Sequence, residues 1–154
     1  MEKIAVFPGS FDPFTRGHES IISRAQPLFD RIIIAIGENS EKKSYFPLEK
    51  RIEMISKLYG GQPKIEVSQY QGLTVDYCRQ VGARFLLRGL RTSADFEFER
   101  AIAQVNLKMN PDVETVFLLT LPEYSPVTST IVREILRYGG DVSPFIPDNL
   151  DIGV

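Results

Sequence analysis

Short apolar runs alternate along this chain with segments in which apolar residues recur at helical spacing. The strand-like runs lie at residues 4–7, 31–36, 65–67, 83–87 and 113–121. The helical segments are predicted over residues 18–29, 47–58, 73–81, 92–109 and 129–138. Strands that are apolar throughout are covered on both faces, which is typical of parallel sheets.

This alternation predicts a protein of the α/β class. We expect a single domain, residues 1–154, built on a Rossmann-like, doubly wound five-stranded parallel sheet with helices on both faces. In such sheets ligands bind beyond the carboxyl ends of the strands, at the switch point of the winding. The candidate functional residues are therefore those that follow the first, second, fourth and fifth strands.

The longest predicted helix, residues 92–109, has a recognisable start and one apolar face. Thr92, with Asp95 three residues later, resembles a capping box. Six apolar residues of this helix keep helical spacing, which marks its packed face. They are Ala94, Phe98, Ala101, Ile102, Val105 and Met109.

Composition and charge narrow the possible partners. The 154 residues include 43% hydrophobic and 25% charged side chains, which is typical of a globular domain. A net charge of -2 favours neither nucleic acid nor an anionic membrane as a partner, so any anion site must be local. Because Cys78 is the only cysteine and no signal-peptide pattern is present, we expect a cytoplasmic protein. The sequence contains no cluster of cysteine and histidine residues, so we expect no metal site built from such ligands.

The loop after the first strand carries the only histidine of the chain. Gly9 permits a sharp backbone bend, and Gly17 lies directly before His18 at the start of a predicted helix. The N-terminus of a helix binds phosphate through its free amide groups and its positive dipole. The alternative is a plain strand–loop–helix connection, but the position of His18 at a predicted ligand edge favours a phosphate site.

Two arginines flank a glycine at the end of the fourth strand. Guanidinium groups bind phosphate in a bidentate manner, and Gly89 between Arg88 and Arg91 permits close backbone approach. The alternative is a pair of solvated surface arginines, but their position at the carboxyl end of a strand argues against it.

After the fifth strand, three hydroxyl residues (Thr128, Ser129 and Thr130) lie at the start of a predicted helix. One of them suffices as a cap, which leaves two for a ligand.

These segments resemble those of a known enzyme family. Residues 15–18, Thr-Arg-Gly-His, resemble the T/H-x-G-H motif of the nucleotidylyltransferase superfamily, and residues 9–13 are similar to its preceding turn. Residues 88–99 resemble the R-G-L-R-x-x-x-D-[FY]-E-x-E signature of bacterial-type phosphopantetheine adenylyltransferases. Residues 127–133 are similar to the superfamily's triphosphate motif, with Val127 and Thr128 where Ile and Ser are usual. With the family-like tail at residues 141–147, the resemblance extends over nearly the whole chain.

The resemblance implies a reaction and a set of binding residues. ATP and 4′-phosphopantetheine would give dephospho-coenzyme A and pyrophosphate, the penultimate step of coenzyme A synthesis, with Mg²⁺ on the pyrophosphate oxygens. His18, Lys42 and Arg88 would be catalytic, with His18 at the α-phosphate, and Arg91, Ser129 and Thr130 would bind the pyrophosphate. The implied acceptor positions are Ser10, Lys42, Thr74 and Arg88. The implied ATP positions are Ser10, Phe11, His18, Gly89, Leu90, Arg91, Glu99, Tyr124, Ser125, Pro126, Val127, Thr128, Ser129 and Thr130.

The family also implies a homohexamer and feedback inhibition by coenzyme A. Two other functions stay open at the level of sequence. A sister nucleotidylyltransferase, such as a cytidylyltransferase, would share Gly17 and His18 but would not need the paired arginines. A non-catalytic nucleotide-binding module would need neither His18 nor a second phosphate site.

Overall fold

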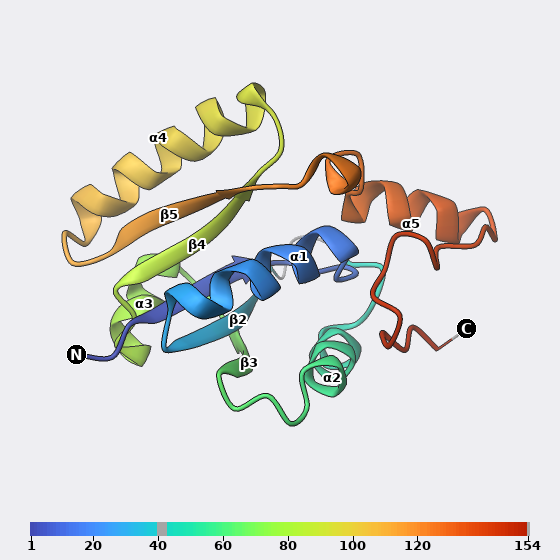
Figure 1. Ribbon diagram of the computed structural model, residues 1–154, viewed down its shortest axis with the longest axis horizontal. Coiled ribbons are helices and arrows are strands. Elements are labelled where there is room, and N and C mark those ends of the chain that lie inside the picture. The colour runs from blue at the N-terminus through green and yellow to red at the C-terminus, as the bar shows by residue number, and fades with distance from the viewer. Residues whose placement is uncertain (40–42, 154) are drawn as a thin grey trace.

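A computed structural model describes residues 1–39 and 43–153 of the chain (Figure 1). Within these residues the strands form one parallel sheet in the order β3-β2-β1-β4-β5. The strands are β1 (Ile4–Gly9), β2 (Arg31–Gly37), β3 (Ile65–Tyr70), β4 (Phe85–Leu90) and β5 (Glu114–Leu119). The helices are α1 (Arg16–Ala25), η1 (Gln26–Leu28), α2 (Leu48–Leu58), α3 (Thr74–Val81), α4 (Ser93–Met109), η2 (Pro122–Tyr124) and α5 (Ser129–Arg137). The predicted doubly wound fold is confirmed.

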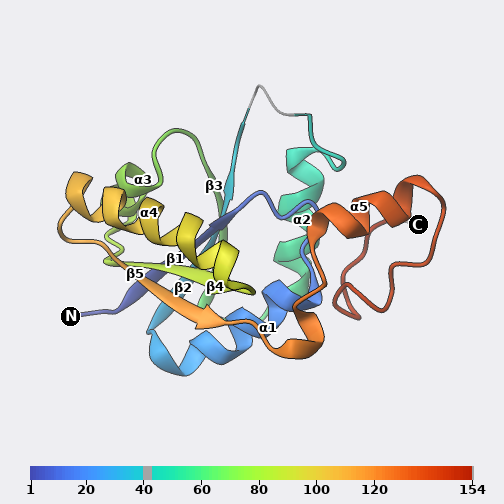
Figure 2. The same ribbon diagram turned by 90° about the horizontal axis from the view of Figure 1, so that it is seen from above.

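Alternate residues of the inner strands pack into two separate cores. On β1, Ala5 and Phe7 join the larger core with residues of α1, α2, α5 and the C-terminal segment. Ile4 and Val6 point the other way and join the smaller core, which α3 covers through Tyr77 and Cys78. Figure 2 shows α1 on the opposite side of the strands from α3 and α4. The side-chain alternation of a strand therefore produces the layering predicted from its apolar runs.

Two predicted elements differ from those in the structure. The helix predicted over residues 18–29 is α1 followed by η1, because Pro27 cannot donate the hydrogen bond that an α-helix needs at that position. The apolar residues that helical spacing assigns to the packed face of α4 are exposed in the structure. Phe98 is 68% exposed and Val105 57% exposed, whereas Glu99 is the buried residue of this helix.

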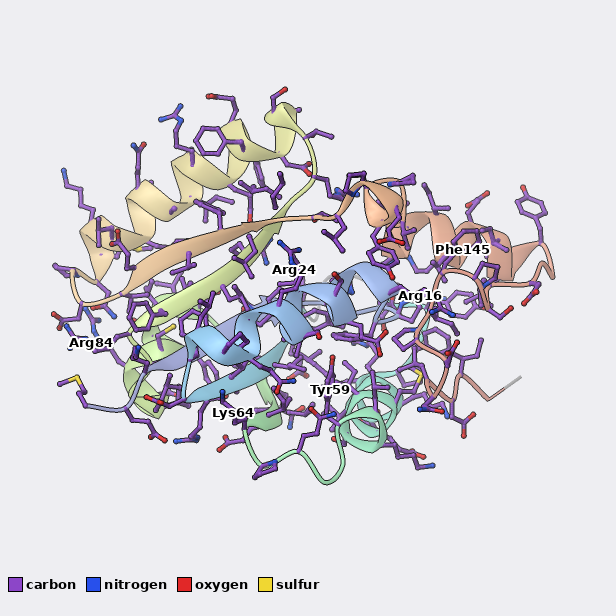
Figure 3. The ribbon with its side chains drawn as sticks, in the orientation of Figure 1. Arg16, Arg24, Tyr59, Lys64, Arg84 and Phe145 are labelled. Atoms are coloured by element: carbon purple, nitrogen blue, oxygen red, sulfur yellow. The ribbon has the colours of Figure 1, made fainter. Side chains whose placement is uncertain are left out.

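The C-terminal segment after α5 lies against the start of α1. The amide of Arg16 donates to the carbonyl of Phe145 at 3.0 Å, and its guanidinium donates to Ser143 O at 3.1 Å and to Asp148 at 2.7 Å (Figure 3). Val142 and Ile146 of the segment are buried in the larger core. These contacts fix the helix that carries His18.

None of the described helices is long and apolar enough to cross a membrane.

Candidate active site

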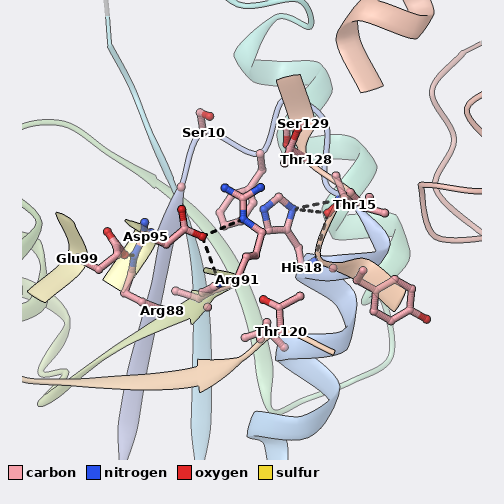
Figure 4. Close-up of a pocket in the computed structure, with 18 of the residues that line it drawn as sticks. Ser10, Thr15, His18, Arg88, Arg91, Asp95, Glu99, Thr120, Thr128 and Ser129 are labelled. Carbon is pink, nitrogen blue, oxygen red and sulfur yellow. Dashed lines mark hydrogen bonds and ion pairs between the residues drawn. The ribbon is translucent and has the colours of Figure 1, made fainter. Parts of the chain in front are cut away.

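A cavity of ≈ 560 Å³ opens at the carboxyl edge of the sheet (Figure 4). It lies between the ends of β1 and β4, the first turn of α1, the start of α4, and the segment 120–130. The predicted residues that line it are Ser10, Phe11, His18, Arg88, Gly89, Arg91, Glu99, Tyr124, Val127, Thr128, Ser129 and Thr130. Of the other predicted ATP positions, Leu90, Ser125 and Pro126 lie outside this lining.

The cavity exists because β1 and β4 separate. These strands pair only at Ala5 with Phe85 and at Val6 with Leu86, although β1 and β2 pair along their whole length. Beyond Val6 the two strands diverge, and the Arg88 side chain spans the gap by donating from Nη1 to Pro8 O at 2.8 Å. The switch point of the winding is therefore an opening in the sheet, as the topology predicted.

The imidazole of His18 is held in one orientation. Its Nδ1 accepts a 3.0 Å hydrogen bond from the amide of Thr15, and Thr15 Oγ1 accepts from the amide of His18 at 3.3 Å. Phe11 and Phe14 pack around the ring, with centroids 5.0 and 5.2 Å from that of His18. Because Nδ1 is an acceptor, the ring proton of neutral His18 lies on Nε2. The lone histidine predicted as functional is thus a fixed hydrogen-bond donor.

The electrostatic surroundings keep this imidazole neutral. Burial, followed by the positive charges of Arg88 and Arg91, lowers the pKa of His18 from 6.5 to about 3. At neutral pH the ring therefore carries no proton on Nδ1 and is a poor base. It can donate from Nε2 to an anion in the cavity without adding a charge of its own.

The loop between β1 and α1 brings its backbone close to the cavity. Phe11 has a positive φ of 47°, and its buried ring lies directly beneath Gly9. A Cβ atom on residue 9 would lie 2.9 Å from Phe11 Cζ, so only glycine fits there without a shift. Ser10 is exposed, while the ring of Phe11 is buried, so Phe11 presents chiefly its backbone to a ligand.

The two arginines at the end of β4 are each paired with a carboxylate of α4. Arg88 Nε donates to Glu99 Oε1, and Arg91 Nε donates to Asp95 Oδ2 at 3.2 Å. Glu99, which the family resemblance places at the nucleotide, is thus in direct contact with Arg88. Both arginines and both carboxylates line the cavity.

The hydroxyl groups at the start of α5 already have partners in the protein. Thr128 Oγ1 caps α5 by accepting from the amide of Ile131 at 3.1 Å. Ser129 Oγ donates to Pro13 O at 2.8 Å, and Thr130 Oγ1 accepts from Arg133 at 3.2 Å. The expectation that one hydroxyl caps while two stay free is therefore corrected. Thr128 and Thr130 keep a hydroxyl proton for a ligand, whereas that of Ser129 is engaged.

A second, smaller cavity of ≈ 220 Å³ adjoins the first. Arg88 and Glu99 border both, and the second cavity is also lined by Tyr70, Thr74 and Asn106. The hydroxyl of Thr74 lies 2.9 Å from that of Tyr70. The predicted acceptor residues Thr74 and Arg88 therefore line the same cavity, while Lys42 lies outside the described residues.

Three buried or half-buried polar residues that support the loop were not predicted as site residues. Arg51 donates to Ser10 O at 2.7 Å and Arg133 donates to Asp12 O at 2.8 Å. The Asp12 carboxylate accepts from the amides of Tyr45 and Phe46. Asp12 and Arg133 occur inside motifs that the sequence displays, whereas nothing around Arg51 distinguishes it from a surface arginine of α2.

Comparisons with known proteins agree with this arrangement. The cytidylyltransferase-like family model matches residues 6–135. Phosphopantetheine adenylyltransferase of Leptospira biflexa is 53% identical over 148 residues, which cover 96% of this chain and 92% of the relative. The enzyme of that name from Bacteroides fragilis is 50% identical, with 96% and 98% covered.

A solved structure shares the fold at low sequence identity. A bifunctional NMN adenylyltransferase/ADP ribose pyrophosphatase from Francisella tularensis superposes with a TM-score of 0.71 at 17% identity. The match covers 95% of this chain but spans only 45% of that longer one. That structure shows the fold alone, whereas the family model and the relatives at 53% and 50% identity establish the chain as a member of the phosphopantetheine adenylyltransferase family.

Proposed function

We propose that the protein transfers the adenylyl group of ATP to 4′-phosphopantetheine, giving dephospho-coenzyme A and pyrophosphate. An oxygen of the acceptor phosphate forms a bond to the α-phosphorus of ATP, and the bond from that phosphorus to the β-bridging oxygen breaks. The observation that carries this proposal is the placement of a neutral His18 beside two arginines, in a cavity that adjoins a second one.

The chemistry suits a site without a general base. The acceptor phosphate is an anion at neutral pH, so no proton has to be removed before it attacks. Catalysis then depends on positioning and on stabilising the charge that develops at the α-phosphate. Nε2 of His18 would donate to that phosphate, and Ser10 would help to orient it. The low pKa of His18, about 3, supports its role as a donor and argues against a role as a base.

The two cavities suit the two substrates. Arg88, together with Lys42, would hold the attacking phosphate, because its side chain lies at the boundary between the larger and the smaller cavity. The pantetheine arm would then occupy the smaller cavity beside Thr74. Arg91, Ser129 and Thr130 would bind the departing pyrophosphate, with Ser129 turning its hydroxyl away from Pro13 on binding.

The donor set fits a magnesium ion that arrives with the nucleotide. Across residues 1–39 and 43–153, no group of three histidine, cysteine or acidic side chains is arranged to hold a metal. Asp95 and Glu99 border the cavity but each faces an arginine. Mg²⁺ is commonly held by phosphate oxygens and water with few carboxylates, and it would reduce the negative charge of the pyrophosphate.

The exposed apolar face of α4 supports the proposal that the protein assembles as a homohexamer. Phe98, Ile102, Val105 and Met109 are exposed on one chain although they lie at helical spacing. An exposed apolar patch of this kind on a soluble protein marks an interaction site. We also propose that coenzyme A inhibits the enzyme in the cytoplasm, because it contains both the adenylate and the phosphopantetheine groups that the two cavities would bind.

Pyrophosphate release provides the test of the reaction. The purified protein would be incubated with Mg²⁺, with ATP or CTP, and with phosphopantetheine or another phosphorylated acceptor. We expect rapid release only with ATP and phosphopantetheine, and dephospho-coenzyme A as the second product by mass spectrometry. A preference for CTP or for another acceptor would indicate a sister enzyme, and no release with any pair would indicate a binding module.

A further inference from the structure

The two arginines of the active site present different groups to a ligand. A guanidinium carries five N–H donors, one on Nε and two on each Nη atom. Arg88 uses Nε for Glu99 and Nη1 for Pro8 O. Arg91 uses Nε for Asp95, and within residues 1–39 and 43–153 no protein group bonds its Nη atoms. Arg91 therefore keeps the paired Nη edge, which suits bidentate binding of a phosphate.

Asp95 is itself fixed at the start of α4. Its amide donates to Thr92 Oγ1 at 3.2 Å, which is the helix cap predicted from the sequence. Its Oδ2 atom accepts two hydrogen bonds from Arg91, one from the amide and one from Nε, both at 3.2 Å. The carboxylate thus links the backbone and the side chain of the same arginine (Figure 4).

We propose that Asp95 is a positioning residue for nucleotide binding: it holds the Nε edge of Arg91 and so turns the Nη edge toward the phosphates of ATP. This inference rests on the proposed function. The pair lies in the cavity wall, with the Arg91 side chain 38% and the Asp95 side chain 29% exposed. A partly exposed ion pair contributes little to folding, so the effect of Asp95 belongs to binding rather than to stability.

Calorimetric titration of the full-length protein with Mg²⁺–ATP tests the proposal without the acceptor. We expect Asp95→Ala to raise the Kd for ATP about tenfold, since an arginine that loses its partner must be ordered by the ligand instead. Asp95→Asn retains an acceptor oxygen and should show a smaller rise. Glu97→Gln is the matched control, because Glu97 pairs with Arg100 on the exposed part of the same helix.

A double-mutant cycle separates positioning from a general structural effect. If Asp95 acts through Arg91, then Asp95→Ala adds no further loss to Arg91→Ala, and the Kd for phosphopantetheine stays within twofold of that of the wild type. Losses that multiply in the double variant, or a wild-type Kd in Asp95→Ala, would overturn the proposal. The thermal unfolding of each variant is measured alongside the titrations. If Asp95→Ala does not fold, Asp95→Asn replaces it in the double-mutant cycle.

The outcome is distinguishable from a failure of the proposed function. A wild-type protein that binds ATP but releases no pyrophosphate with phosphopantetheine would refute the reaction, and the binding cycle would still decide the role of Asp95.

Discussion

His18 combines a fixed orientation, a low pKa and a position near two positive charges. Replacement by alanine removes the Nε2 donor but leaves Arg91 and the hydroxyl residues in place. We expect His18→Ala to lower turnover by roughly 10²–10³ with nearly unchanged ATP affinity, the pattern of a donor that acts mainly in the transition state. Steady-state kinetics and calorimetry measure the two quantities. Turnover close to that of the wild type would exclude this role, and lost folding by circular dichroism would point to a structural one.

The low pKa of His18 also affects stability below neutral pH. Above pH 6.5 the imidazole is neutral in the folded and the unfolded chain, so it contributes no pH dependence. As the pH falls from 6.5 toward about 3, the unfolded chain binds a proton that the folded chain does not, and the free energy of unfolding decreases. Urea unfolding at pH 7.0 and 5.0 should show a smaller decrease for His18→Gln than for the wild type. Equal decreases would contradict the shift.

The Arg88 side chain bonds to Pro8 O of β1 and to Glu99 of α4, and it borders both cavities. We expect Arg88→Ala to weaken phosphopantetheine binding by about 1.5–3 kcal/mol, because the acceptor phosphate loses a charged partner. Titration with each substrate separately measures the change, and Arg100→Ala, on the exposed side of α4, is the matched control. Lost ATP affinity with unchanged acceptor affinity would show that Arg88 and Arg91 have the opposite roles.

Among the elements, the loop between β1 and α1 depends most on a single glycine. A methyl group at position 9 would lie 2.9 Å from the ring of Phe11, which packs on His18. We expect Gly9→Ala to reduce stability by about 1–3 kcal/mol and to lower turnover, since overpacking displaces the aromatic ring. Gly60→Ala is the control, because there the added methyl meets neighbours at an ordinary 3.5 Å. Denaturant unfolding and turnover that are unchanged in Gly9→Ala would show that the loop adjusts freely.

The sequence predicts elements well where one local signal decides, and less well where tertiary contacts decide. The inner strands are apolar on both sides, so β1 and β2 follow directly from their sequence. The ion pair of Arg88 with Glu99 joins residues eleven positions apart on different elements, which no periodicity reveals. The helical spacing of apolar residues in α4 predicts a packed face, but it does not specify whether the same chain packs against that face. The prediction for α4 was wrong for this reason.

At the scale of the whole molecule, the exposed apolar face of α4 provides a test of the proposed assembly. We expect Val105→Glu, which places a charge on the exposed face of α4, to convert the proposed hexamer into smaller species. Light scattering coupled to size-exclusion chromatography measures the mass. Leu28→Glu is the matched control, because Leu28 is 47% exposed in η1, on another part of the surface. A hexamer that survives Val105→Glu would place the interface elsewhere, and a wild-type monomer would refute the assembly.

The separation of β1 from β4 has a consequence for how such a site diversifies. His18 and the loop after β1 belong to one cavity, whereas Thr74 and Asn106 line only the other. If the cavities hold the two substrates as proposed, substitutions at Thr74 and Asn106 would therefore change the acceptor site without altering the residues that line the larger cavity. A structure that contains an NMN adenylyltransferase shares this fold at 17% identity, so the sheet tolerates extensive change of sequence.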